Sequence, residues 1–301
     1  MDKVSVIIPT YRRPREMVKR AVDSVAAQTY KNIEIVLVDD NAAPENIKER
    51  EAVFALAAEY DVTLLTLVTN PAPCGGAVSR NNGIAASAGD YITFLDDDDR
   101  YLPDKIEKQL AYMKENELDM CFTELRLVNS AEKTVDYREF SKIPSFDMET
   151  LLKYHLMHNI TGTPTFMYKR ELIERIGGFE DVRVSQEYYL MMKTIQADAK
   201  IGYYTGCGVV AYRHGGPTIS SGKTKIIWEK KLYKFKQKYF DLLTKKEQRY
   251  VRFRYYAILS VSSLRSRDYI GWLFYGAIGA LSSPVTFVSE FTAHLARKSG
   301  M

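Results

Sequence analysis

The chain has 301 residues, 46% of them hydrophobic and 27% charged, so its composition is that of a folded globular protein and does not indicate disorder. Its net charge of +4 is small for this length, which argues against a nucleic-acid-binding protein. Three widely spaced cysteines argue against a disulfide framework or a zinc site and fit a reducing cytosol. The first apolar run, 4–8, is too short for a signal sequence, so we expect a cytoplasmic protein.

The first half of the chain alternates predicted strands with predicted helices. Strands are expected over 4–8, 33–38, 62–68 and 91–95, with helices after Pro14, over 46–58 and after Gly75-Gly76. This alternation is typical of an α/β fold in which helices cover both faces of a mostly parallel sheet.

The second half contains further predicted strands and then only helices. Strands are expected over 119–128, 164–168, 201–204 and 208–213, and helices over 147–157 and 186–198. From about Lys223 the pattern is helical and rich in Lys, Arg and Tyr. We therefore predict an α/β domain over 1–221 and a helical extension over 222–301.

Polar residues follow each of the first four predicted strands. They are Thr10 and Tyr11, Asp39 and Asp40, Asn70, and the run Asp96 to Asp99. Ligands of parallel α/β sheets bind beyond the carboxyl ends of the strands, so these side chains predict a binding site there. The first strand is followed by neither a GxGxxG turn nor a Walker lysine loop, which disfavours a dinucleotide-dependent dehydrogenase.

Four adjacent carboxylates, Asp96 to Asp99, are the most distinctive feature of the sequence. Their mutual repulsion must be offset, and a divalent cation that also binds phosphate oxygens would do this. In an extended segment Asp96 and Asp98 point the same way and reach one ion. The alternative is a solvated acidic loop before a helix that begins near Pro103. We expect Asp99 to face solvent or to cap that helix.

Several longer segments lie in a fixed order over about residues 3–221. They read VSVIIPTYRRP, EIVLVDDNA, AVSRNNGIAASAGDYITFLDDDDRYLPDKIEKQ, GTPTFMYKRELIERIGGFEDVRVSQEYYLMMKTI and YRHGGPTIS. Together they resemble the family 2 glycosyltransferases with the GT-A fold, including enzymes of bacterial polysaccharide assembly. The resemblance implies inverting transfer of a hexosyl or N-acetylhexosaminyl group from a UDP-sugar, with Mn²⁺ or Mg²⁺ as cofactor.

The resemblance also implies roles for particular residues. The donor site would contain Pro9, Thr10 and Tyr11 at the nucleoside, Asp39 at a uracil N–H, Arg80 at the diphosphate or base, Asp96, and Asp97 at the ribose. The metal would be held by Asp96 and Asp98 of a DXD-like motif, with His214 near the metal or phosphates, and Thr163 and Pro164 would line the sugar and acceptor. Simpler alternatives are packing for Tyr11, a turn for Asp39, a surface position for Arg80 and a structural role for His214.

Glu187, in the first turn of a predicted helix, resembles the family's catalytic base. Many relatives have Asp here, and a carboxylate at a helix start is also common because of the helix dipole. As a general base, Glu187 would take the proton of the acceptor hydroxyl. The two other functions considered are a nucleotidyltransferase, whose Gly-rich basic loop is absent, and a noncatalytic nucleotide-sugar-binding or scaffold protein.

The segment 270–289 contains no charged residue and is flanked by Arg and Lys. Its length would span a bilayer, but its glycines and Pro284 weaken it as a spanning helix. We expect 268–298 to lie on an anionic membrane surface; packing on protein ranks second and a true span third. Such an anchor at the inner face of the cell membrane would hold the enzyme near a saccharide or lipid-linked saccharide acceptor, with loops at 129–150 helping to form the acceptor pocket.

Overall fold

The computed structural model describes residues 1–160, 162–213 and 222–290. Two compact units are present, one made of Met1–Leu152 and Ile160–Gly215 and the other of Lys153–Asn159 and Gly216–Met301. The unit boundary near 215 lies close to the predicted division at 221/222. The sequence did not predict that Lys153–Asn159, at the end of a helix, would belong with the C-terminal helices.

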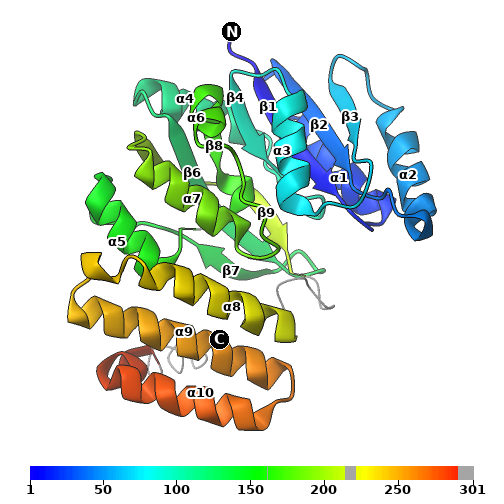
Figure 1. Cartoon of the computed structure of the whole chain (residues 1–301). Helices are drawn as coiled ribbons and strands as arrows, with labels where there is room; N and C mark the ends of the chain where they lie inside the picture. Colours follow the sequence, from blue (N-terminus) through cyan, green and yellow to red (C-terminus); the bar gives the residue numbers. More distant parts are fainter. Residues whose placement is uncertain (161, 214–221, 291–301) are drawn as a thin grey trace. The chain divides into compact units, whose positions relative to one another are not determined.

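The first four strands form the parallel sheet that the alternating pattern predicted (Figure 1). They are β1 (Val4–Thr10), β2 (Ile33–Asp39), β3 (Leu65–Thr69) and β4 (Tyr91–Phe94), in the order β3-β2-β1-β4. The third strand begins three residues later than expected because the Leu64 and Leu65 amides donate to the Asp61 carbonyl and form a turn.

Helices cover both faces of this parallel half. They are α1 (Arg15–Ala26), α2 (Ile47–Ala57) and α3 (Gly76–Ala86), and Figure 1 shows α3 crossing β1 and β2. Alternate residues of β1 face opposite sides: Val6 and Ile8 share a hydrophobic cluster with Val22 of α1, whereas Ile7 faces α3. A Cβ on Gly83 would stand 2.4 Å from the Ile7 side chain, so α3 packs closely because that residue is glycine.

The second half of the sheet is mixed rather than parallel. Its strands are β5 (Arg100–Tyr101), β6 (Met120–Val128), β7 (Thr134–Arg138), β8 (Met167–Lys169) and β9 (Ile201–Tyr212), and the helices beside them are α4 (Lys105–Glu115), α5 (Met148–His158), α6 (Arg170–Arg175) and α7 (Gln186–Gln196). β8 runs antiparallel to β4 and β6, and only β9 runs parallel to β6 among the described pairs. The two strands predicted over 201–213 are one strand, with register shifts opposite Glu124 that accommodate the Gly-rich middle.

The C-terminal unit is helical, as predicted. It contains α8 (Gly222–Gln237), the 3-10 turn Phe240–Leu242, α9 (Lys245–Arg265) and α10 (Tyr269–Ser282). Tyr233 of α8 stacks on Tyr255 of α9 with ring centroids 4.0 Å apart. The buried Lys236 ammonium donates to the Leu156 carbonyl and to Asn159, which fastens the end of α5 to these helices. Burial lowers the pKa of Lys236 to about 8.

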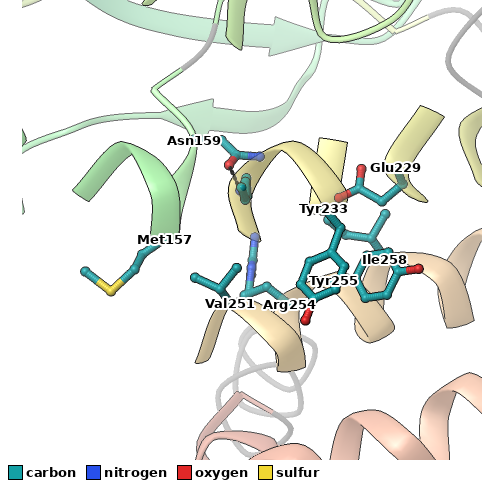
Figure 2. Close-up of a pocket in the computed structure, with 9 residues that line it drawn as sticks. Met157, Asn159, Glu229, Tyr233, Val251, Arg254, Tyr255 and Ile258 are labelled. Carbon is teal, nitrogen blue, oxygen red and sulfur yellow. Dashed lines mark hydrogen bonds between the residues drawn. The ribbon is translucent and has the colours of Figure 1, made fainter. Parts of the chain in front are cut away.

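The cavity shown in Figure 2 lies within this C-terminal unit. It is lined by Asn159, Glu229, Tyr233, Arg254 and Tyr255, among others, and has room for about one water molecule. It is therefore too small for a nucleotide, and it belongs to a different unit from the polar strand ends.

Candidate functional site

The carboxyl ends of the first three strands meet in one row. Thr10 pairs with Asp39, and Asp39 pairs with Thr69. Just beyond this row the Asp40 amide donates to the Thr10 carbonyl, and the Asn70 amide donates to the Asp39 carbonyl, each at 3.0 Å. The polar residues after the strands are therefore brought together, as the sequence predicted.

Asp39 is fully buried and only partly satisfied. Its Oδ1 accepts a hydrogen bond from the Asn41 side chain at 2.7 Å, which is the turn role considered above. Its Oδ2 has no hydrogen-bond donor among the described residues, and the nearest cation, the Arg50 Nε, lies 3.5 Å away. Because buried acceptors are nearly always paired, Oδ2 is suited to an N–H supplied by a ligand.

Pro9 and Thr10 complete β1, and Tyr11 follows directly. Tyr11 is 40% exposed, so it is not a core residue. An exposed aromatic ring directly after the Thr10–Asp39 pair can lie against a planar base.

Asp40 organises the loop that leads into α3, a role that sequence reasoning missed. Its carboxylate accepts hydrogen bonds from the Asn70 side chain at 2.7 Å and from the Cys74 and Gly75 amides at 2.9 Å. The available signal was its place immediately after a buried strand. By fixing the start of α3, Asp40 sets the position of Arg80 one turn further along.

The acidic run forms a turn, not an extended segment. The Asp99 amide donates to the Asp96 carbonyl at 3.0 Å, so the expectation that Asp96 and Asp98 share a face of an extended chain is wrong. Asp97 and Asp99 are buried, whereas the Asp96 side chain is 37% exposed and the Asp98 side chain 17%.

Arginines offset much of the repulsion within the run. Arg13 contacts Asp97 at 2.9 Å through Nε and Asp98 at 2.6 Å through a terminal nitrogen. Sequence reasoning did not assign Arg13, although its place just after the first strand was a signal. Burial raises the pKa of Asp97 to about 7 despite the opposing effect of the Arg13 charge.

Asp99 is a structural residue of this loop. Its carboxylate accepts a hydrogen bond from the Tyr212 amide of β9 at 3.0 Å. Burial and the neighbouring carboxylates raise the pKa of Asp99 well above its usual range. The predictions that it faces solvent or caps the next helix are both wrong, because its side chain is turned inward and the residue before α4 is Asp104.

Arg80 connects the acidic turn to α7. Its guanidinium pairs with Asp96 and donates to the Gln186 side chain at 2.8 Å, while lying 5.5 Å from the centre of the Phe179 ring. Arg80 is buried, so its alternative role as an ordinary surface arginine is wrong. Glu187, the residue after Gln186, is half-buried in the first turn of α7. Ser185, just before this helix, is in the left-handed region with φ 64°.

The remaining candidates are less informative. Thr163 and Pro164 are buried in a 3-10 turn, Thr163–Thr165, that precedes β8 and packs beside β4. His214 lies outside the described residues. Within 1–160, 162–213 and 222–290, no three His, Cys, Asp or Glu side chains cluster as a ready-made metal cage. Mg²⁺ needs only one or two carboxylates plus phosphates and water. Asp96 and Asp98 are the two partly exposed carboxylates of the acidic turn, and in this structure they pair with Arg80 and Arg13.

Comparison with known proteins gives the family. The family model described as glycosyl transferase family 2 matches residues 5–177, more than half of the chain. An uncharacterized glycosyltransferase of Methanocaldococcus jannaschii is 30% identical over 203 residues, which cover 66% of this chain and 68% of the relative. The amylovoran biosynthesis glycosyltransferase AmsB of Erwinia amylovora is 29% identical, with 66% of this chain and 64% of AmsB covered. For other relatives the matched part is as little as 21% of the relative's own length.

Solved structures agree on the fold. The structure of S. aureus TarS 1–349 in complex with UDP-GlcNAc is 18% identical, covers 93% of this chain and 73% of that chain, and has a TM-score of 0.56. The same protein in complex with UDP is 17% identical, with 91% of this chain and 90% of that chain covered and a TM-score of 0.56. The predicted GT-A fold with a helical C-terminal region is thereby confirmed.

Proposed function

The chain belongs to glycosyl transferase family 2, and from this membership we propose that it moves a sugar from a uridine diphosphate donor to an acceptor hydroxyl. The observation that carries the proposal is the Arg80 bridge, which joins Asp96 after β4 to Gln186 at the start of α7. One buried side chain thus connects the strand ends suited to a nucleotide with the helical turn that carries a candidate base, Glu187.

The uracil specificity is assigned to Asp39. Its buried Oδ2, which has no hydrogen-bond donor among the described residues, would accept the N3–H of uracil, while Tyr11 would lie against the ring. The two structures of S. aureus TarS, one with UDP and one with UDP-GlcNAc, support a uridine nucleotide.

Asp39→Asn should change the base preference of the site. The variant loses the charged acceptor for the uracil N3–H, so we expect UDP affinity to fall by roughly 10- to 100-fold, the value of a hydrogen bond to a charged group. The asparagine amide can instead donate to N3 of cytosine. CDP affinity should fall less or rise. Calorimetry with both nucleotides measures the ratio, with Asp61→Asn at an exposed turn as the matched control. An unchanged UDP:CDP ratio would contradict the assignment.

The proposed reaction is a single displacement at the anomeric carbon. Glu187 takes the proton of the acceptor hydroxyl, and the resulting oxygen attacks from the face opposite the diphosphate, which inverts the anomeric centre. Arg80 keeps Asp96 and the α7 turn in place, and Arg13 holds Asp97 and Asp98. We propose that Asp96 and Asp98 hold Mn²⁺ or Mg²⁺ against the donor phosphates. When bound there, the cation balances the charge that grows on the leaving diphosphate.

Arg80→Lys should slow transfer by roughly 10- to 100-fold. One ammonium cannot reproduce the planar fork that reaches Asp96 and Gln186 together, so the α7 turn loses its connection to the acidic turn. Steady-state kinetics measure the change, and Arg15→Lys, in an exposed ion pair, is the matched control. Transfer equal to that of the unsubstituted enzyme would show that the bridge is dispensable.

The acceptor is proposed to be a saccharide or lipid-linked saccharide in polysaccharide synthesis at the cytoplasmic face of the membrane. The relative named for amylovoran biosynthesis supports this process. Thr163, Pro164 and the loops within 129–150 are the proposed sugar and acceptor contacts.

Release of UDP from a panel of UDP-sugars, measured with and without candidate saccharide acceptors, tests the proposed function. A transferase releases UDP faster when a suitable acceptor is present. Binding of UDP-sugars without release, across the whole panel and with Mn²⁺ present, would favour the noncatalytic scaffold instead. Release of inorganic diphosphate from a nucleoside triphosphate would favour a nucleotidyltransferase.

A further inference from the structure

The helix α10 carries a continuous apolar face that no described residue covers. Ile270, Leu273, Phe274 and Leu281 follow one another at helical spacing on this face, and they are 84%, 63%, 59% and 81% exposed. We call these four residues the α10 stripe. Single exposed apolar residues are ordinary, but an aligned set on one helix marks an interaction surface.

The packing of α10 on α9 explains why the stripe faces outward. On the opposite side of α10, a Cβ on Gly279 would lie 3.4 Å from the Tyr256 Cβ, and one on Gly276 would lie 3.3 Å from the Ser260 Oγ. The Ser260 hydroxyl also donates to the Trp272 carbonyl at 2.9 Å. Gly276 and Gly279 let α10 approach α9 closely on this side. This contact fixes the rotation of α10 about its own axis and leaves its large apolar side chains exposed on the opposite side.

A second short helix continues the apolar surface. Pro284–Glu290 turns by 114° from α10, and it exposes Val285 (83%) and Val288 (58%). Among the described residues no single helix is long and apolar enough to cross a bilayer, although the bent pair together meets that test of length and composition.

The positive charge of the chain is concentrated in its C-terminal part. Residues 222–301 contain 16 Lys and Arg but only five Asp and Glu, a net charge of +11 in a chain whose total is +4. Exposed Arg249 and Arg252 precede Tyr256 by seven and four residues, so they project from the side of α9 on which α10 packs. Exposed Arg265 and Arg267 lie just before α10.

We propose that the α10 stripe lies in the plane of an anionic lipid bilayer, with the arginines of α9 at the lipid headgroups. An apolar face beside a strongly basic surface complements a membrane whose surface is negative and whose interior is apolar. A nucleic acid would use the positive charge but not the apolar side chains. This inference rests on the C-terminal unit alone and is independent of the proposed transfer reaction.

Flotation of the full-length protein with vesicles tests the proposal. Vesicles of phosphatidylglycerol and phosphatidylcholine should bind the protein, pure phosphatidylcholine should bind it at least tenfold less, and added salt should weaken binding. The double substitution Leu273→Asp and Leu281→Asp should lower binding to the anionic vesicles by about tenfold or more, because it places two charges in the apolar face. Val62→Asp, at a residue 86% exposed in the other unit, is the matched control.

Two results would overturn the proposal. One is equal vesicle binding by the double variant and the unsubstituted protein, with matching circular-dichroism spectra and thermal unfolding showing that both are folded. The other is a dimer in solution that the double variant abolishes while vesicle binding is absent throughout, which would assign the stripe to a second copy of the chain.

Discussion

Replacing Glu187 by glutamine should lower the rate of sugar transfer by about 10²–10⁴-fold, the usual contribution of a positioned general base. Glutamine keeps the size and hydrogen-bonding capacity of the side chain but cannot accept the proton of the acceptor hydroxyl. Glu187 lies in the first turn of α7, where the positive end of the helix dipole favours the ionised carboxylate that a base requires. The donor residues lie mainly on β1, β2 and the acidic turn, so UDP affinity should change little.

The informative experiment measures transfer rate and UDP affinity on the same preparation. Glu174→Gln is the matched control, because Glu174 is half-exposed and pairs with Arg170 at 3.0 Å. Near-normal transfer by Glu187→Gln would remove Glu187 from the base role and direct attention to Asp181 or Glu180. A loss of both transfer and UDP affinity would show instead that Glu187 supports the donor pocket.

Much of the proposed donor site could be predicted because the sequence signals for its strands and helices are local. Buried β-branched runs end at Thr10 and Asp39, and parallel pairing then places those ends in one row without further information. Gly75-Gly76 marked the start of α3 and thereby the helix that carries Arg80.

The partners of the charged groups could not be predicted because they depend on tertiary contacts. Arg13 meets Asp97 across 84 residues, and Arg80 meets Gln186 across 106. Asp99 turns inward because β9 offers the Tyr212 amide, and its sequence context contains no sign of that strand. The mixed half of the sheet was missed for the same reason: strand direction is set by long connections, not by the residues of each strand.

Asp98→Ala should abolish measurable transfer while leaving the chain folded. The Asp98 side chain is 17% exposed in the acidic turn and pairs with Arg13, whose Nε keeps its contact with Asp97 in the variant. Folding should therefore survive. The proposed cation site loses one of its two carboxylates, and the arginine charge beside it is less neutralised, so a divalent cation should bind much more weakly.

Calorimetry separates this loss of cation binding from a general loss of structure. In the unsubstituted protein UDP affinity should rise with Mn²⁺ or Mg²⁺ and fall when EDTA is added, because ion and diphosphate bind together. In Asp98→Ala it should be the same with and without the cation, whereas Asp104→Ala, just before α4, should keep the full dependence. Identical UDP affinity with and without metal in the unsubstituted protein would remove the cation from the site. The acidic turn would then owe its charge balance to arginines, among them Arg13 and Arg80, and these would have to stabilise the leaving diphosphate.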